Sequence, residues 1–117
     1  MATAPIDDLI ERLRAFVRER DWGQFHTPKN LSCALAVEAA ELLEQFQWAQ
    51  DAPASAIPPD KRERIADEIG DVLIYVLLLS DGLGIDPVAA AHRKLAINAE
   101  RYPVALAKSS SKKYTEL

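Results

Sequence analysis

The chain has 117 residues, of which 49% are hydrophobic and 27% are charged, a composition typical of a folded globular protein of one domain. The formal net charge of −4 argues against a nucleic-acid partner. Four glycines leave no phosphate-binding loop of the Walker or dinucleotide type. Two histidines and one cysteine exclude an HExxH zinc site, an internal disulfide and a multi-cysteine cluster. We predict a single domain over residues 1–117.

The sequence also predicts a cellular location. The longest apolar run, residues 72–79, is far shorter than the roughly 20 residues that a membrane-spanning helix needs. The N-terminus lacks the basic and apolar segments of a secretory leader, and Cys33 as a lone cysteine fits a reducing compartment. We therefore expect a cytoplasmic protein with no membrane partner.

Two amphipathic helices are predicted in the first half of the chain. The first runs from Ile6 to about Arg20, because its apolar residues are spaced by three and four. A loop over residues 21–26 follows. Thr27, an N-cap followed by Pro28 at the first helical position, opens the second helix, which the apolar stripe carries to about Ala49.

The proline-rich segment 50–59 predicts a loop, and the second half predicts two more helices. Asp60 and Glu63 have the spacing of a capping box that starts a third helix, reaching about Gly82. Asp86 caps a fourth helix, which ends near Arg101 or Tyr102 before a proline. Residues 108–117 are polar and predict a C-terminal tail.

The predicted fold is all-α and resembles a four-helix bundle, because no segment shows the alternation of a strand. The third helix is apolar nearly all round over residues 72–79, too much for a helix with one solvated face. A chain of this length has little interior in which to bury that surface, which predicts an oligomer formed through helix packing.

Two acidic doublets are the sharpest chemical signal. Glu38 and Glu41 are three residues apart on the second predicted helix, as are Glu68 and Asp71 on the third, which puts each pair on one helix face. Carboxylates beside apolar stripes are costly unless they are paired or bind cations. Four carboxylates facing one another would bind Mg²⁺, or Mn²⁺ in its place. The alternative is that both doublets are ordinary solvated helix faces.

Other polar and aromatic residues allow two interpretations each. Trp22, Phe25 and Trp48 would form a pocket for a nucleobase, or would close the ends of the core. Tyr75, on the helix face of the second doublet, would contact a ligand of the metal or belong to the core. Lys94, Asn98 and Arg101 form a stripe that would bind phosphate or simply face solvent.

These segments together resemble the MazG-like all-α nucleoside triphosphate pyrophosphohydrolases, and most closely their dCTP pyrophosphatase branch. The family signature is ExxE followed, after a spacer, by ExxD, as in Glu38 to Glu41 and Glu68 to Asp71. The resemblance extends over RERDWGQFHTPKNL, EAAELLEQFQW, DEIGDVLIYVLLL, KLAINAERYP and SSSKKYTEL, nearly the whole chain beyond the first helix.

The resemblance implies Mg²⁺-dependent hydrolysis of a deoxynucleoside triphosphate to the monophosphate and pyrophosphate, with dCTP and modified dCTP as substrates in nucleotide-pool sanitation. It implies metal binding by the four carboxylates. Our own hypothesis is that Glu41 and Glu38 are catalytic, with Glu44 as a weaker candidate base. It also implies a homotetramer with shared pockets. The implied nucleotide-binding residues are Trp22, Gly23, Gln24, Phe25, His26, Trp48, Tyr75, Lys94 and Asn98.

The resemblance fails at one position and leaves two alternatives. A close relative has a pocket histidine on the first helix where this chain has Leu13, with Arg14 adjacent, so the first-helix contacts are not carried over. The same chemistry on dUTP or another non-standard nucleotide fits the residues as well. A non-catalytic helical interaction module is the alternative from a different class.

Overall fold

Helices make up all the regular structure in the computed structural model, which describes residues 4–117. The prediction of an all-α chain is confirmed. Contacts divide the chain into two units, one through Gly84 and one from Ile85 to Leu117. The elements are α1 (Pro5–Glu19), the 3₁₀ turn η1 (Gly23–Phe25), α2 (Pro28–Glu44), η2 (Ala54–Ala56), α3 (Pro59–Gly82), α4 (Pro87–Arg101), α5 (Val104–Ala107) and η3 (Tyr114–Glu116).

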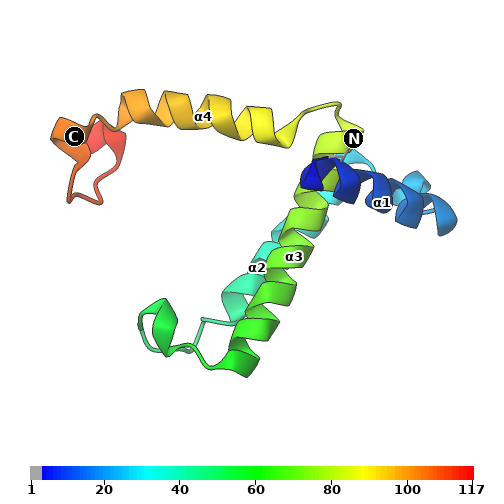
Figure 1. The fold of residues 1–117 in the computed structure, drawn as a ribbon, viewed down its shortest axis with the longest axis horizontal. Coiled ribbons are helices and arrows are strands. Elements are labelled where there is room, and N and C mark those ends of the chain that lie inside the picture. The colour runs from blue at the N-terminus through cyan, green and yellow to red at the C-terminus, as the bar shows by residue number, and fades with distance from the viewer. Residues whose placement is uncertain (1–3) are drawn as a thin grey trace. The chain divides into compact units, whose positions relative to one another are not determined.

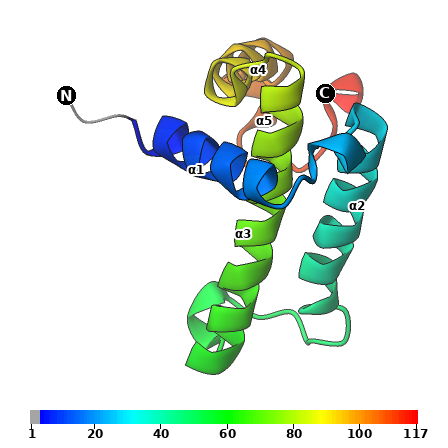
Figure 2. The same ribbon diagram turned by 90° about the vertical axis from the view of Figure 1, so that its right-hand side faces the viewer.

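The antiparallel pair of α2 and α3 is the framework of the first unit. The two helices run side by side, and α1 crosses α3 near the C-terminal end of that helix (Figures 1 and 2). Leu31 of α2 and Leu77 of α3 are the fully buried apolar residues of the described chain. Within the first unit, Arg14 of α1 forms an ion pair with Asp81 of α3.

Two predicted helix starts are confirmed and one is wrong. The Thr27 hydroxyl accepts a hydrogen bond from the Asn30 amide at 3.2 Å, and the Asp86 carboxylate accepts from the Val88 and Ala89 amides, both at 3.0 Å. The capping box at Asp60 does not form. The N-cap is Pro58 and α3 begins at Pro59, two residues earlier than an N-cap at Asp60 would give, because the consecutive prolines 58 and 59 already set the backbone angles of a helix start.

The second helix ends five residues earlier than its apolar stripe predicts. After Glu44 the backbone tightens, and the amides of Gln45, Phe46 and Ala49 donate to carbonyls three residues earlier. The predicted end at Ala49 is therefore wrong. These tight turns take Trp48 out of the helix, and its side chain is 90% exposed.

The second unit consists of α4 and the segment that follows it. The predicted polar tail contains a short helical turn, and Tyr114 packs back on the end of α4. The Tyr114 ring meets Tyr102 edge to face at 6.0 Å between centroids, and the Arg101 guanidinium lies 4.8 Å from the Tyr114 centroid. The tail therefore has contacts of its own within this unit.

Large apolar side chains remain exposed on both central helices. Ile69 and Leu73 of α3 are 52% and 39% exposed, and Val37 and Leu43 of α2 are 56% and 64% exposed. No single helix within residues 4–117 has both the length and the apolar character to cross a bilayer, although α3 and α4 taken together meet that criterion. The apolar surface of α3 that the sequence predicts is thus visible on the isolated chain.

Candidate active site

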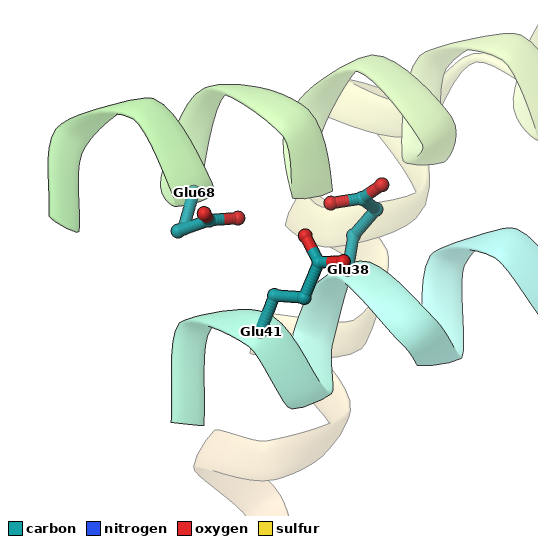
Figure 3. Close-up of side chains that lie close together, drawn as sticks. All are labelled: Glu38, Glu41 and Glu68. Carbon is teal, nitrogen blue, oxygen red and sulfur yellow. The ribbon is translucent and has the colours of Figure 1, made fainter. Parts of the chain in front are cut away.

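Three carboxylates from α2 and α3 converge in the space between the two helices. One oxygen atom from each of Glu38, Glu41 and Glu68 lies within 4.8 Å of the other two, and Figure 3 shows the side chains approaching from both helices. All three residues are half-buried. The structure thus brings together three of the four carboxylates that the sequence singles out.

Helix geometry explains why the residues meet. Residues three apart are neighbours on a helix surface, so Glu38 and Glu41 project from one face of α2 toward α3. Helix α3 runs antiparallel to α2, which sets Glu68 opposite that face. The spacing within each doublet and the pairing of the two helices together produce the cluster.

The carboxylates of the cluster repel one another because they are close together and half-buried. One oxygen each of Glu38 and Glu68 is buried with no hydrogen-bond donor among the described residues. Burial, then the Glu41 carboxylate, then the charges of Asp71 and Glu68 raise the pKa of Glu38 to about 7. Burial, followed by the charges of Glu41 and Asp71, also raises the pKa of Glu68. A bound cation would relieve both effects.

Asp71 lies one turn beyond Glu68 on α3 and is half-buried. It is not among the three residues whose oxygens gather within 4.8 Å. Its charge nevertheless raises the pKa of both Glu38 and Glu68, so its carboxylate lies at the edge of the same cluster. A fourth ligand from Asp71 stays a prediction.

An apolar cavity of about 140 Å³ lies farther along the same face of α3. Tyr75 and Leu78 follow Asp71 at helical spacing, so the face passes from carboxylates to the cavity wall within about 10 Å along the helix axis. The wall is built from α1, the η1 segment and α3. The lining residues are Leu13, Phe16, Val17, Trp22, His26, Ile74, Tyr75 and Leu78.

Three of the predicted nucleotide-binding residues, Trp22, His26 and Tyr75, therefore share one cavity. Trp22 meets His26 edge to face at 6.3 Å between ring centroids. The residues between them are placed differently. The Gln24 amide donates to the backbone carbonyl and the carboxylate of Asp21, and the Phe25 side chain is 59% exposed.

The remaining predicted site residues lie elsewhere. Trp48 follows the C-terminal end of α2, roughly 25 Å along that helix from η1, so one chain does not bring it to the cavity of Trp22. Lys94 and Asn98 lie on α4 in the second unit, where Asn98 is half-buried and Lys94 is exposed. Their role in binding stays a prediction.

A second cavity, of about 380 Å³, adjoins the first and has charged walls. Val17, His26 and Leu78 line both cavities. The remaining lining residues are Arg14, Arg18, Asp21, Gly23, Leu31, Asp81 and Gly82. No residue of α1 was predicted to bind nucleotide, although the resemblance aligns Leu13 with a pocket position of a relative, and Leu13 and the adjacent Arg14 each line one of the two cavities.

Known proteins resemble this chain in sequence and in fold. A family model described as the MazG-like family matches residues 33–117. The chain is 49% identical over 111 residues to dCTP pyrophosphatase 1 of Homo sapiens, and the aligned region covers 92% of this chain and 65% of that protein. It is 41% identical over 119 residues to dCTP pyrophosphatase 1 of Bos taurus, with 99% and 70% covered. The chain thus spans about two thirds of the length of these relatives.

A solved structure has the same fold. The crystal structure of a pyrophosphatase from Archaeoglobus fulgidus DSM 4304 superposes with a TM-score of 0.81 at 38% identity. The match covers 88% of this chain and 96% of the archaeal one. The helical framework that carries the carboxylates is therefore that of a solved pyrophosphatase.

Proposed function

Because the chain belongs to the MazG-like family, we propose that it hydrolyses a deoxynucleoside triphosphate to the monophosphate and pyrophosphate. The observation that supports this most directly is the cluster of Glu38, Glu41 and Glu68, with two buried oxygen atoms that have no donor. The names of the relatives, dCTP pyrophosphatase and pyrophosphatase, support the same reaction.

The residues present fit a divalent cation. Each of the three clustered carboxylates offers an oxygen atom, and oxygen ligands are those that Mg²⁺ and Mn²⁺ prefer. A positive charge would pair with the unpartnered oxygens of Glu38 and Glu68 and would remove the like-charge repulsion that raises their pKa values. We propose that Asp71 completes the set and that Mg²⁺ is the physiological ion.

The chain's own groups would then bind the triphosphate and move one proton. When bound, the cation supplies positive charge to the triphosphate oxygens. Glu41, or Glu38 beside it, accepts the proton of the water that attacks the α-phosphorus, and the bond to pyrophosphate breaks. Glu44 is exposed at the end of α2 and is the weaker base. Lys94 would offset charge on the leaving pyrophosphate, and Asn98 would offer a neutral hydrogen-bonding group to the phosphates.

The volume of the cavity, about 140 Å³, favours a substrate whose base has a single ring. A dry protein cavity of about 150 Å³ is large enough to hold a benzene ring, so this volume suits a pyrimidine better than a purine. Trp22 and Tyr75 offer ring faces in its wall. We propose dCTP or a modified dCTP as substrate, with dUTP as the alternative, since both have a single six-membered ring.

We further propose that the active form is a homotetramer that sanitises the cytoplasmic nucleotide pool. The exposed apolar residues of α2 and α3 support association, because the isolated chain fully buries only Leu31 and Leu77 among its described apolar residues. In such an assembly Trp48, remote from the cavity of its own chain, would reach the site of a neighbouring copy.

Product analysis tests the proposed reaction. The purified protein is incubated with Mg²⁺ and a panel of dNTPs and modified dNTPs, and nucleotides and pyrophosphate are measured separately. We expect dCMP and pyrophosphate, with turnover lost in Glu68→Gln and kept in Glu63→Gln, an exposed glutamate of the same helix. Orthophosphate as the first product would place the attack at another phosphorus and refute the proposal.

A second variant separates a role in catalysis from a role in folding. Asp71→Asn removes the charge at the edge of the cluster but keeps the size of the side chain. We expect turnover to be abolished while the helical circular dichroism spectrum is unchanged. Loss of the helical spectrum would instead assign Asp71 a structural role.

A further inference from the structure

Helix α1 contributes three residues to the wall of the 140 Å³ cavity, yet no residue of α1 is fully buried. Leu13 and Val17 are half-buried, and Phe16 is 43% exposed. The packing of α1 on α3 is only weakly stabilised by its apolar side chains, because they are partly exposed and the stabilisation is proportional to the area removed from water. The position of α1 must therefore depend on other contacts as well.

One such contact is the ion pair between Arg14 of α1 and Asp81 of α3. The Arg14 Nε donates to one carboxylate oxygen of Asp81 at 2.9 Å, and a terminal guanidinium nitrogen donates to the other oxygen. Such a two-point pairing fixes direction as well as distance. The Arg14 guanidinium also holds the pKa of Asp81 below its usual value, so the partner stays charged.

The place of this pair on both helices matters. Arg14 directly follows Leu13 of the cavity wall, and Asp81 lies one turn beyond Leu78, the last wall residue of α3. Val17, His26 and Leu78 line both the 140 Å³ cavity and the larger one, and Arg14 and Asp81 lie in the wall of the larger one. The ion pair thus joins the two helices immediately beside the apolar cavity.

Aromatic contacts extend the effect of α1 to the rest of the wall. The Arg20 guanidinium lies 3.7 Å from the Phe16 ring centroid, and the Phe16 ring meets Trp22 edge to face at 5.6 Å. Trp22 in turn meets His26. A shift of α1 on α3 would therefore move Phe16, and with it the ring that Trp22 offers to a base.

We infer that Arg14 and Asp81 are positioning residues, whose ion pair clamps α1 over the nucleoside cavity and thereby determines the affinity for the base. This inference rests on the proposed function, because it assigns the cavity to the base of the substrate. Neither residue is placed to touch the reacting phosphorus, since Asp81 lies 13 residues, or about 20 Å along α3, from Glu68 of the carboxylate cluster.

Steady-state kinetics of the full chain test the clamp. The variants are Arg14→Met, which keeps the apolar stem but removes the guanidinium, and Asp81→Asn, which keeps the shape of its side chain. Arg18→Met is the matched control, because Arg18 lies one turn along α1 and lines the same larger cavity. KM and kcat are measured with the preferred dNTP. Inorganic tripolyphosphate, which has no base, is measured as a competitive inhibitor.

Both clamp variants are expected to raise KM about two- to fivefold, the upper part of the range that a partly exposed ion pair allows. We expect kcat to change less than twofold, and the Ki of tripolyphosphate to stay at the wild-type value in every variant. The exchanged double variant, Arg14→Asp with Asp81→Arg, is expected to recover most of the affinity. Hydrogen exchange at the α1 amides should be faster in Arg14→Met than in Arg18→Met.

Unchanged KM in both Arg14→Met and Asp81→Asn would overturn the inference. So would an equal rise in KM and in the Ki of tripolyphosphate, because that result would mean a general loss of structure. If Arg14→Met fails to fold, Asp81→Asn alone decides between these outcomes. A wild-type protein that hydrolyses no nucleotide would refute the proposed function itself, whereas active wild-type protein with insensitive variants would refute only the clamp.

Discussion

Replacing Glu38 with glutamine should make the metal-free protein more stable while removing its activity. The folded chain holds the Glu38 carboxylate among Glu41, Asp71 and Glu68, and one of its oxygens is buried without a donor. Deprotonation in this environment is costly, whereas the unfolded chain exposes the same carboxylate to water. Glutamine has nearly the same size and no charge, so the variant Glu38→Gln removes the cost and leaves the packing of α2 unchanged.

The direction of the pH dependence follows from the raised pKa. The pKa of Glu38 is about 7 in the folded chain against 4.5 for an unperturbed glutamate, so the folded state binds more protons between these values. The free energy of unfolding therefore falls as the pH rises through this window and stays low above it. A difference of one pKa unit between the folded and unfolded states corresponds to about 1.4 kcal/mol. Because Glu38 is partly exposed and solvent screens its charge, we expect the free energy of unfolding to fall by only about 1–2 kcal/mol across this pH window.

Thermal unfolding in EDTA at pH 5 and at pH 8 measures the effect. We expect Glu38→Gln to melt about 3–10 °C above the wild type at pH 8, and much closer to it at pH 5. At pH 5 the folded chain holds Glu38 protonated, and this costs little because the pH is near the unperturbed pKa of 4.5. Glu44→Gln, on the exposed surface of the same helix, serves as control and should show no such difference. Millimolar Mg²⁺ should raise the melting temperature of the wild type at pH 8 but not that of Glu38→Gln. A variant less stable than the wild type at pH 8 would refute the account of a strained carboxylate.

Two further variants test the base cavity and the second unit. Trp22→Ala should raise KM at least fivefold with a smaller change in kcat, because stacking on an aromatic ring is worth about 1–3 kcal/mol per base. Phe25→Ala, outside the cavity wall, is the comparison, and equal effects would argue against the cavity as the base site. Asp86→Ala should lower the free energy of unfolding by about 1 kcal/mol, since it removes the side-chain cap of α4. Urea unfolding measures this change, and an unchanged midpoint would contradict the role of the cap.

Local features of the fold could be predicted from the sequence, because they depend on neighbouring residues. Thr27 and Asp86 are caps that act within three residues, and both are confirmed. The end of α2 was missed because Phe46 continues the apolar spacing of a helix, although the backbone has already tightened into turns with bonds to the third preceding carbonyl. Periodicity reports which side chains share a face and does not report when the hydrogen-bond pattern changes.

The candidate site also contains features that depend on neighbouring residues and features that depend on residues far apart in the chain. The spacing of Glu38 and Glu41 is a local property, and it was sufficient to predict that both lie on one helix face. Whether that face meets a partner helix or solvent stayed open until the structure showed Glu68 opposite it. The cavity wall supplied by α1 depends on how that helix crosses α3, which the sequence does not encode in any short spacing. Arg14 and Asp81 are 67 residues apart in the chain, and each alone is an ordinary charged residue of a helix surface. Only the folded chain shows that they meet.

The carboxylate cluster and the apolar cavity therefore depend on different physical interactions. The carboxylate cluster is costly to the isolated chain, because burial and the neighbouring carboxylates raise the pKa of Glu38, and a bound cation would offset that cost. The cavity is apolar, adds no charge, and depends on a helix whose residues are only partly buried. Chemistry can therefore be retained while base preference changes, because substitutions on α1, such as those at Leu13, alter the wall without touching the carboxylates.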